Sequence, residues 1–177
     1  MSNMRPHPGP RHAVRRFHSV PEQPVHIRAQ LDDGYSLHHA VWEVLQASDL
    51  KSASMTFISG GFSELKFTTG DSETRADSNK QANFTFIREW QNCSMIYGAA
   101  TAGLNVEVAP MLHAHAVFAD AQGRQFGGHL FPEDCIISHP IFAHIVAHPK
   151  AVLQQFYDDE TTHTVFNPLT KDNAHVF

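Results

Sequence analysis

The sequence predicts an α+β fold with a mostly antiparallel, twisted sheet and one main amphipathic helix. Apolar and polar residues alternate in many short stretches separated by turn-forming residues, which is typical of antiparallel strands. Only one stretch, residues 37–48, repeats its apolar residues clearly at helical spacing. A parallel nucleotide-binding sheet would need helices between its strands, so this pattern favours the antiparallel arrangement.

The first half of the chain is expected to begin with a strand and the helix. Apolar and polar residues alternate from Val25 to Leu31, and Asp32-Asp33-Gly34 then forms a turn. Ser36 can cap the helix by accepting a hydrogen bond from an otherwise unpaired amide. The elements expected next are a strand over 53–58, a bend or bulge at 60–61, a strand over 62–69 and an exposed loop over 70–82.

The second half is expected to consist mainly of strands. Residues 120–124 form a hairpin loop between strands at 112–119 and 126–131. Shorter strands are expected at 84–87, 94–97 and 106–108, followed by a long β-rich run over 136–147 in which Pro140 marks an edge or a bend, and by a short helix over 150–157.

Length and composition predict one domain with two appendages. We expect a flexible, basic, proline-rich arm over 1–22, a domain over 23–158, and a C-terminal extension over 159–177 that packs on or near it. Residues 1–20 hold four arginines and no acid, so the remaining nine basic and eighteen acidic residues give the rest of the chain a charge of −9, within a net charge of −5. A duplex-binding domain normally presents a basic face, which this acidic body does not suggest.

Several protein classes lack support in the sequence. There is no apolar run long enough for a membrane helix, no secretory signal, no glycine-rich phosphate-binding motif and no nucleophile elbow. Cys93 and Cys135 are not spaced as a disulfide framework, so we expect two small buried hydrophobes in a cytoplasmic protein.

Histidine is over-represented, with fourteen in 177 residues, and three of them are spaced for metal binding. His113 and His115 should project from one face of a strand, because residues two apart in a strand share a face. The hairpin loop should bring His129 back to their level. Three imidazoles with a free fourth position are typical of a catalytic or exchangeable zinc site, and they also suit other first-row metals.

Other interpretations of these residues remain open. The three histidines could instead bond to backbone or solvent, or pack at a subunit interface without metal. A fourth ligand or an outer hydrogen bond could come from His139, His144 or His148. As acid or base candidates the sequence offers Glu64, Glu107, Asp120 and His144, although single carboxylates at strand ends are usually solvated.

The segment from His113 to Leu130, His-Ala-His-Ala-Val-Phe-Ala-Asp-Ala-Gln-Gly-Arg-Gln-Phe-Gly-Gly-His-Leu, resembles the plants-and-prokaryotes-conserved (PPC) domain. That family carries a His-Leu-His strand, an Asp-x-x-Gly-Arg turn and a Gly-Gly-His-Leu return strand. Weaker likenesses follow in the family's order at Leu31-Asp-Asp-Gly34, at Ser59-Gly-Gly-Phe62 and at Cys93-Ser-Met-Ile-Tyr-Gly98. The resemblance covers about residues 24–147.

The resemblance implies an α+β domain of the stand-alone bacterial type that assembles as a homotrimer. It also implies association with DNA, and zinc binding through His113, His115 and His129. The chain lacks the Arg-Gly-Arg-Pro hook of the plant members, which removes the usual basis for minor-groove binding. Two functions therefore stand: a trimeric regulatory module that holds a metal, and a metal-dependent enzyme acting on an unknown small substrate, possible because such a site can activate water.

Overall fold

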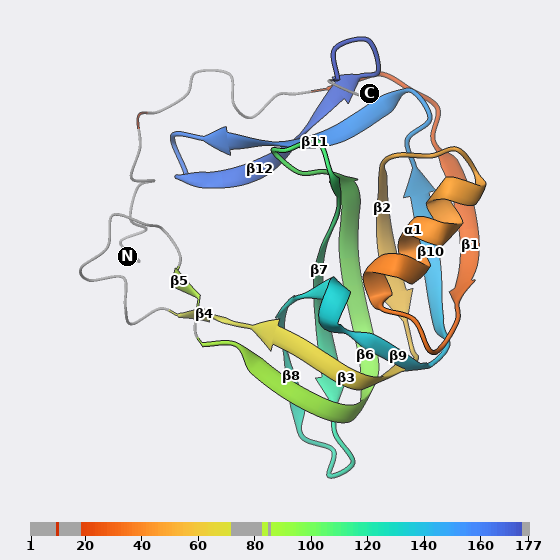
Figure 1. The fold of residues 1–177 in the computed structure, drawn as a ribbon, viewed down its shortest axis with the longest axis vertical. Coiled ribbons are helices and arrows are strands. Elements are labelled where there is room, and N and C mark those ends of the chain that lie inside the picture. Colours follow the sequence, from red (N-terminus) through yellow and green to blue (C-terminus); the bar gives the residue numbers. More distant parts are fainter. Residues whose placement is uncertain (1–9, 11–18, 72–82, 85, 175–177) are drawn as a thin grey trace, which may run out of the picture.

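The computed structural model describes residue 10 and residues 19–71, 83–84 and 86–174. Its main sheet has ten strands in the described part of the chain, and eight of them follow the order β1-β10-β2-β6-β7-β8-β3-β9 (Figure 1). The strands are β1 (Val25–Leu31), β2 (Ala53–Ile58), β3 (Gly61–Thr68), β6 (Arg88–Leu104), β7 (Pro110–Ala119), β8 (Gln125–Leu130), β9 (Ile136–His139), β10 (Ile141–Ala147), β11 (Ala151–Asp158) and β12 (His163–Thr170). Every pairing along the eight-strand order is antiparallel, which confirms the expected fold class.

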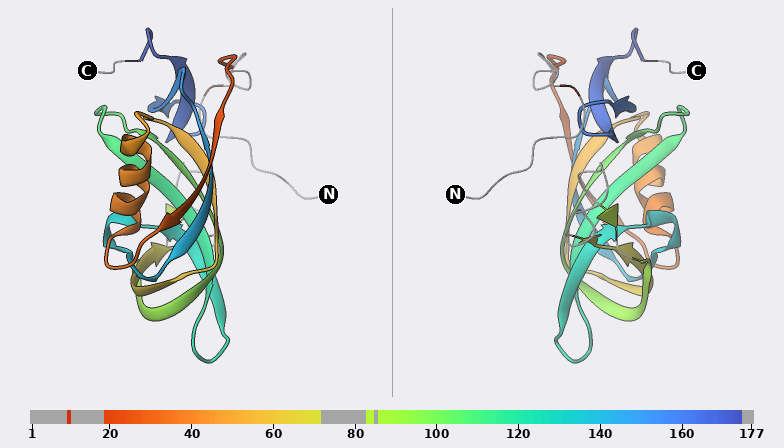
Figure 2. Two further views of the ribbon diagram at one scale, coloured as in Figure 1. Left: turned by 90° about the vertical axis from the view of Figure 1, so that its right-hand side faces the viewer. Right: turned by 90° about the vertical axis from the view of Figure 1, so that its left-hand side faces the viewer.

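Helix α1 (Leu37–Ala47) lies against one face of the sheet (Figures 1 and 2). Its N-terminus is capped by Ser36, whose side chain accepts a hydrogen bond from the backbone N–H of His39 at 3.2 Å, as the sequence predicts. The helix stops where Asp49 takes a positive φ of 52° and the Leu50 amide bonds back to the Leu45 carbonyl. At 11 residues it is too short and not apolar enough to cross a membrane, and the described residues contain no helix that could.

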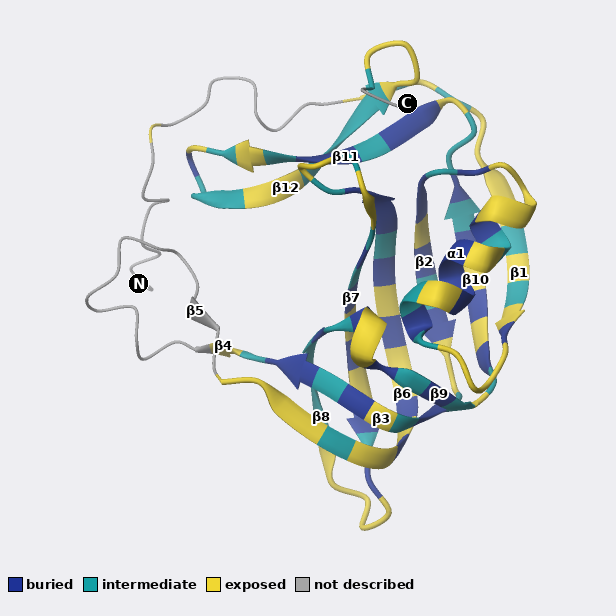
Figure 3. Cartoon of the chain, in the orientation of Figure 1, coloured by how far each residue is buried: buried dark blue, intermediate teal, exposed yellow. Residues whose placement is uncertain are grey.

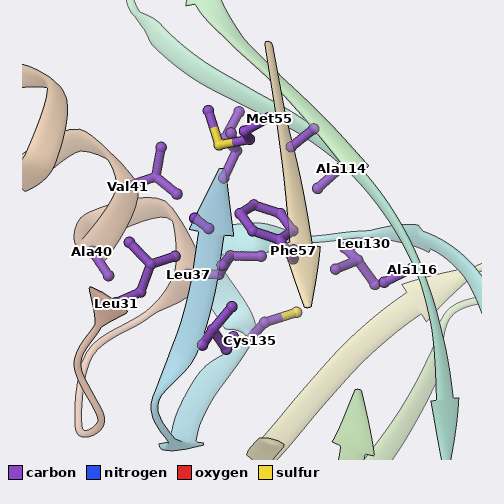
Figure 4. Packing of buried hydrophobic residues seen from close by; sticks show 14 of the residues in the cluster. Leu31, Leu37, Ala40, Val41, Met55, Phe57, Ala114, Ala116, Leu130 and Cys135 are labelled. Atoms are coloured by element: carbon purple, nitrogen blue, oxygen red, sulfur yellow. The ribbon is translucent and has the colours of Figure 1, made fainter. Parts of the chain in front are cut away.

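The core fills the space between α1 and the sheet. Alternate residues of β2, β7 and β10 are buried, so these strands turn one face inward and leave the other open (Figure 3). Phe57 from β2 lies beside Leu37 of the helix, and Val41 and Ala114 belong to the same buried cluster (Figure 4). Because α1 covers only this face, the opposite face of the central strands is exposed over much of its area.

Three of the expected strands have other bounds in the structure or are not strands. Residues 94–97 belong to the 17-residue strand β6, which pairs with β3 near its start and with β2 further on. Residues 106–108 form a turn rather than a strand, because the side-chain oxygen of Asn105 accepts hydrogen bonds from the amides of Glu107 and Ala109. Within 84–87, residue 84 pairs in the two-residue strand β5 (Asn83–Phe84), but 86 and 87 are not in a strand.

The helix expected over 150–157 is wrong. This segment is strand β11, which pairs along its length with β12 and touches the end of β6 through Gln154 and Leu104. Gln154 and Gln155 are both buried, so tertiary pairing outweighs a weak local helical tendency. The domain boundary expected at residue 158 falls between the two strands of this one hairpin.

The appendages are described only in part. Residues 1–9 and 11–18 of the expected arm lie outside the described residues, and so do residues 72–82 of the expected loop. At the start of that loop, β4 (Gly70–Asp71) pairs with β5 instead of being irregular. The last residue of the expected arm, Glu22, is held by the domain: its carboxylate accepts hydrogen bonds from the amides of Lys150 and Ala151 at 3.1 and 3.2 Å and contacts the ring of His148.

Candidate metal centre

The ring nitrogens of three histidines converge on the open face of the sheet. His113 and His115 lie two residues apart on β7, and β8 places His129 directly opposite His115 in the register. The Nε2 atoms of His113 and His115 are 3.0 Å apart, and Nδ1 of His129 is 3.4 Å from Nε2 of His115. One ligand atom from each ring lies within 4.8 Å of the other two. The structure thus brings together the three histidines that the sequence singles out.

The spacing of these nitrogens suits a first-row metal ion. Zinc binds imidazole nitrogen at about 2.0–2.1 Å, so two nitrogens on a tetrahedral ion lie about 3.3 Å apart. Two of the three separations in the structure, 3.0 and 3.4 Å, bracket that value, and all three lie within 4.8 Å. Three imidazoles leave at least one coordination position for water or another ligand, and the exposed His115 shows that the cluster opens towards solvent.

The electrostatics of the cluster favour neutral rings, which are the form that binds metal. Burial, and then the proximity of His113 and His115, lowers the pKa of His129 to about 4. Burial, and then the charge of His115, lowers the pKa of His113, and burial lowers that of His115. Because the pKa of each ring is lowered, protons compete less with a metal ion for these ring nitrogens.

The hairpin loop fixes the register that aligns the rings. The carboxylate of Asp120 accepts hydrogen bonds from the amides of Gln122 and Arg124, both at 2.9 Å, and pairs with the Arg124 side chain at 2.6 Å. Gly123 adopts the positive φ of 75° that the turn requires. The Arg124 guanidinium lies 5.5 Å from the centre of the Trp90 ring, which ties the loop to β6.

Two glycines before His129 let strand β8 pack tightly between its neighbours. A Cβ atom on Gly128 would lie 2.2 Å from the Thr68 carbonyl oxygen of β3, and one on Gly127 would lie 2.4 Å from the Ala116 carbonyl oxygen of β7. Glycine at such positions can allow close backbone approach or leave room for an ion, a water or another subunit. The structure shows close approach, because neighbouring backbone fills the space.

The other histidines proposed as ligands lie outside the cluster. Among the described residues, the group of potential ligand atoms contains His113, His115 and His129 alone. His139 is paired with Ser138 at 3.1 Å, and His148 is engaged by Glu22. The site therefore gains no fourth histidine from these positions.

The candidate acid and base residues are also dispersed. Glu64 and Glu107 are exposed, Glu107 in the turn between β6 and β7, and Asp120 is used by the hairpin loop. Burial raises the pKa of the Cys93 thiol to about 11 and that of Cys135 to about 12, so neither is a ready nucleophile. His144 is the exception, because it lines a hollow next to the cluster.

This hollow is a space of about 420 Å³ on the open face, lined by both His113 and His115 on one side and by His144 on the other. Its floor contains Ser54 and Thr56 of β2. The sequence could not reveal it, because it depends on the long-range pairing of β10 with β2 and of β2 with β6.

The C-terminal hairpin adds a second feature that sequence reasoning missed. The ring of Phe166, on β12, meets the His113 ring edge-on, with centroids 6.5 Å apart. A Cβ atom on Gly103 would lie 2.9 Å from Cε1 of Phe166 and 2.2 Å from the Leu153 carbonyl oxygen, so the hairpin sits directly on β6. The Phe166 ring thus borders the histidine cluster at this end.

Comparison with known proteins identifies the family pattern. The sequence model of the Plants and Prokaryotes Conserved (PCC) domain, the family called PPC above, matches residues 19–147. The hairpin formed by β11 and β12 lies beyond the matched range. None of the curated proteins matches the chain.

Several solved structures have a similar fold. A putative DNA-binding protein of Ralstonia eutropha JMP134 is 20% identical, with a TM-score of 0.62 over 79% of this chain and 89% of that one. A metal-containing protein of Archaeoglobus fulgidus is 16% identical, with a TM-score of 0.62 over 85% and 96% of the two chains. A plant- and prokaryote-conserved (PPC) protein of Pyrococcus horikoshii is 15% identical, with a TM-score of 0.59 over 86% and 99%. At these identities the likeness establishes the fold.

Proposed function

Because the chain belongs to the Plants and Prokaryotes Conserved domain family, we propose that it is a metal-holding regulatory module of that family. His113, His115 and His129 bind one divalent first-row metal, with zinc as the first candidate. The observation that carries this proposal is the convergence of three ring nitrogens at separations that suit an ion. The metal-containing protein of Archaeoglobus fulgidus, which shares the fold, supports it.

The metal proposal is tested by purifying the protein without a nickel column and measuring metals by plasma mass spectrometry. We expect about one ion per chain in the wild type and almost none in a His113→Ala/His115→Ala double variant. His139→Ala is the matched control, because this exposed histidine lies outside the cluster. Equal metal content in the double variant and the wild type would show that the ligands are elsewhere.

We propose that the module assembles as a homotrimer. Support comes from a row of exposed apolar side chains across the open face: Ile58, Tyr97, Val117 and Phe142 are 57, 49, 43 and 42% exposed and are register neighbours on four adjacent strands. Contiguous apolar patches of this kind usually mark contact surfaces. Light scattering should give three times the chain mass of 19.8 kDa, and Tyr97→Asp should lower it, whereas a monomeric wild type would refute the assembly.

Association with DNA belongs to the same proposal, as a weak and salt-sensitive property. Solved structures with a similar fold include putative DNA-binding proteins, but the net charge of this chain is −5. Phosphate contacts require clustered cations, and the arginines of residues 1–20 supply the densest group in the sequence. A gel shift over a salt series should show retardation only at low salt. No retardation at any salt concentration would leave proteins as the only regulatory partners.

A second candidate function is a metal-dependent enzyme of the cytoplasm, favoured by the open hollow beside the cluster. A bound zinc ion would supply a water whose pKa is lowered to about 7. The chain would supply the substrate site. Among the residues that the structure describes, and apart from the metal ligands, His144 is the acid–base group that faces this site. Hydrolysis that stops when the metal is removed, and that His144→Ala slows without loss of metal, would favour this function over the regulatory one.

A further inference from the structure

The open face of the sheet carries three adjacent rows of cross-strand neighbours. They are His26, Val146, Ser54, Thr101 and His113; then Arg28, His144, Thr56, Ala99, His115 and His129; then Gln30, Phe142, Ile58, Tyr97, Val117 and Gly127. The first two rows run from the edge strand β1 across the hollow to the histidine cluster. The third row lies next to the second and carries the apolar side chains of Phe142, Ile58, Tyr97 and Val117.

The charge of these rows is unlike that of the whole protein. The chain carries a net charge of −5, yet none of the residues in the three rows is Asp or Glu. Arg28 is the fixed charge, and five histidines accompany it. A metal ion in the cluster would add two further positive charges at the other end. A concave surface with charges of one sign attracts ligands of the opposite sign.

The floor of the hollow lies between His144 and the histidine cluster, and it includes the hydroxylated side chains of Ser54, Thr56 and Thr101 as well as Val146 and Ala99. Arg28 pairs with His144 on the neighbouring edge strand. Between His144 and His115 the register places only Thr56 and Ala99, and the next row adds the hydroxyls of Ser54 and Thr101. His144 and His115 are three strand spacings apart, about 14 Å. A metal bond of about 2 Å and a hydrogen bond of about 3 Å leave roughly 9 Å for a ligand. The ring of His26 stacks on the ring of His144, with centroids 5.7 Å apart.

We infer that this hollow binds a small hydroxylated dianion, in which two acid groups are joined by a short polyol chain. One acid group takes the open position on the metal, so the inference rests on the proposed function. The second acid group is held by Arg28 and His144, and the hydroxyls of the chain bond to Ser54, Thr56 and Thr101. The side chains at each end and on the floor match this chemistry separately.

The inference is tested by calorimetry on metal-loaded, dialysed protein with three six-carbon probes. Glucarate has two carboxylates and four hydroxyls, gluconate lacks one carboxylate, and adipate lacks the hydroxyls. We expect glucarate to bind most tightly, and gluconate and adipate to bind about tenfold more weakly, because each loses one set of hydrogen bonds, one of them charge-assisted. Equal affinities for glucarate and gluconate would overturn the inference.

Variants at the end away from the metal identify the groups that hold the second acid. Arg28→Ala and His144→Ala should each weaken glucarate binding about tenfold and leave gluconate binding and metal content unchanged. Arg88→Ala is the matched control for the arginine, because Arg88 is exposed and lies outside the three rows. Thr56→Val removes a hydroxyl at nearly constant volume, and should weaken glucarate binding but not adipate binding.

Metal analysis of the same samples separates the two possible failures. If the wild type holds no metal, the proposed function fails, and the inference fails with it. If the metal is present but Arg28→Ala and His144→Ala bind glucarate as the wild type does, the ligand is held by the metal alone. The inference then fails while the metal proposal stands.

Discussion

Substitution of Gly128 by alanine tests how tightly the fold holds the histidine cluster. The new Cβ atom would lie 2.2 Å from the Thr68 carbonyl oxygen and 3.1 Å from Cδ2 of Phe67, both in β3. A carbon and a carbonyl oxygen normally approach no closer than about 3.3 Å, so the strands must separate by roughly 1 Å. The contact is with the backbone of a strand, and both Thr68 and Phe67 are buried.

This strain should appear in both stability and metal affinity. Overpacking of a well-filled site costs about 1–3 kcal/mol, and we expect the upper half of that range because the backbone of β3 cannot rotate aside. For a chain of this size the melting temperature should fall by roughly 4–10 °C in thermal unfolding followed by circular dichroism. Because residue 128 precedes His129, metal affinity should fall at least about tenfold, since small ligand displacements have such effects.

Gly70→Ala is the matched control, because a Cβ atom at Gly70 meets nothing within 4 Å. It should change the free energy of unfolding by no more than about 0.5 kcal/mol. If Gly128→Ala melts within a degree or two of this control and holds metal as well as the wild type, β8 is not clamped between its neighbours, and our explanation of the Gly-Gly pair is refuted.

Three further predictions follow from the same site. Metal retention should stay constant through neutral pH and fall as the pH drops towards about 4, the lowered pKa of His129. In metal-free protein the free energy of unfolding should also decrease as the pH is lowered from about 6.5 towards 4, because the unfolded chain takes up a proton that the folded ring resists. Loss at the ordinary histidine pKa would contradict this. Asp120→Ala should lower stability by about 1–3 kcal/mol in urea unfolding, because two loop amides lose their acceptor, whereas the exposed Gln122→Ala should not. Phe166→Ala should weaken metal binding severalfold, whereas Val165→Ala, at an exposed position, should leave it unchanged. Equal effects of the two variants would show that the Phe166 ring beside His113 has no role in metal binding.

Local sequence information was sufficient for the hairpin that carries the cluster. His113 and His115 share a face because strand geometry alternates, and the Asp120 turn fixes the position of His129. The capped helix and the strand over 53–58 were predictable for similar reasons, since each depends on neighbours along the chain.

Long-range pairing explains what the sequence did not reveal. His144 faces the cluster only because β10 inserts between β1 and β2, and no local pattern specifies that order. Residues 150–157 carry a modest helical tendency, but they become a strand because β12 and the end of β6 offer partners. Phe166 reaches His113 through the same hairpin.

The most direct test of the central claim is X-ray absorption on wild-type protein loaded with one equivalent of zinc. We predict three imidazole nitrogens at about 2.0–2.1 Å from the metal and one further light atom that exogenous ligands can replace. A spectrum of fully hydrated zinc, or one that is unchanged in the His113→Ala/His115→Ala variant, would contradict the account.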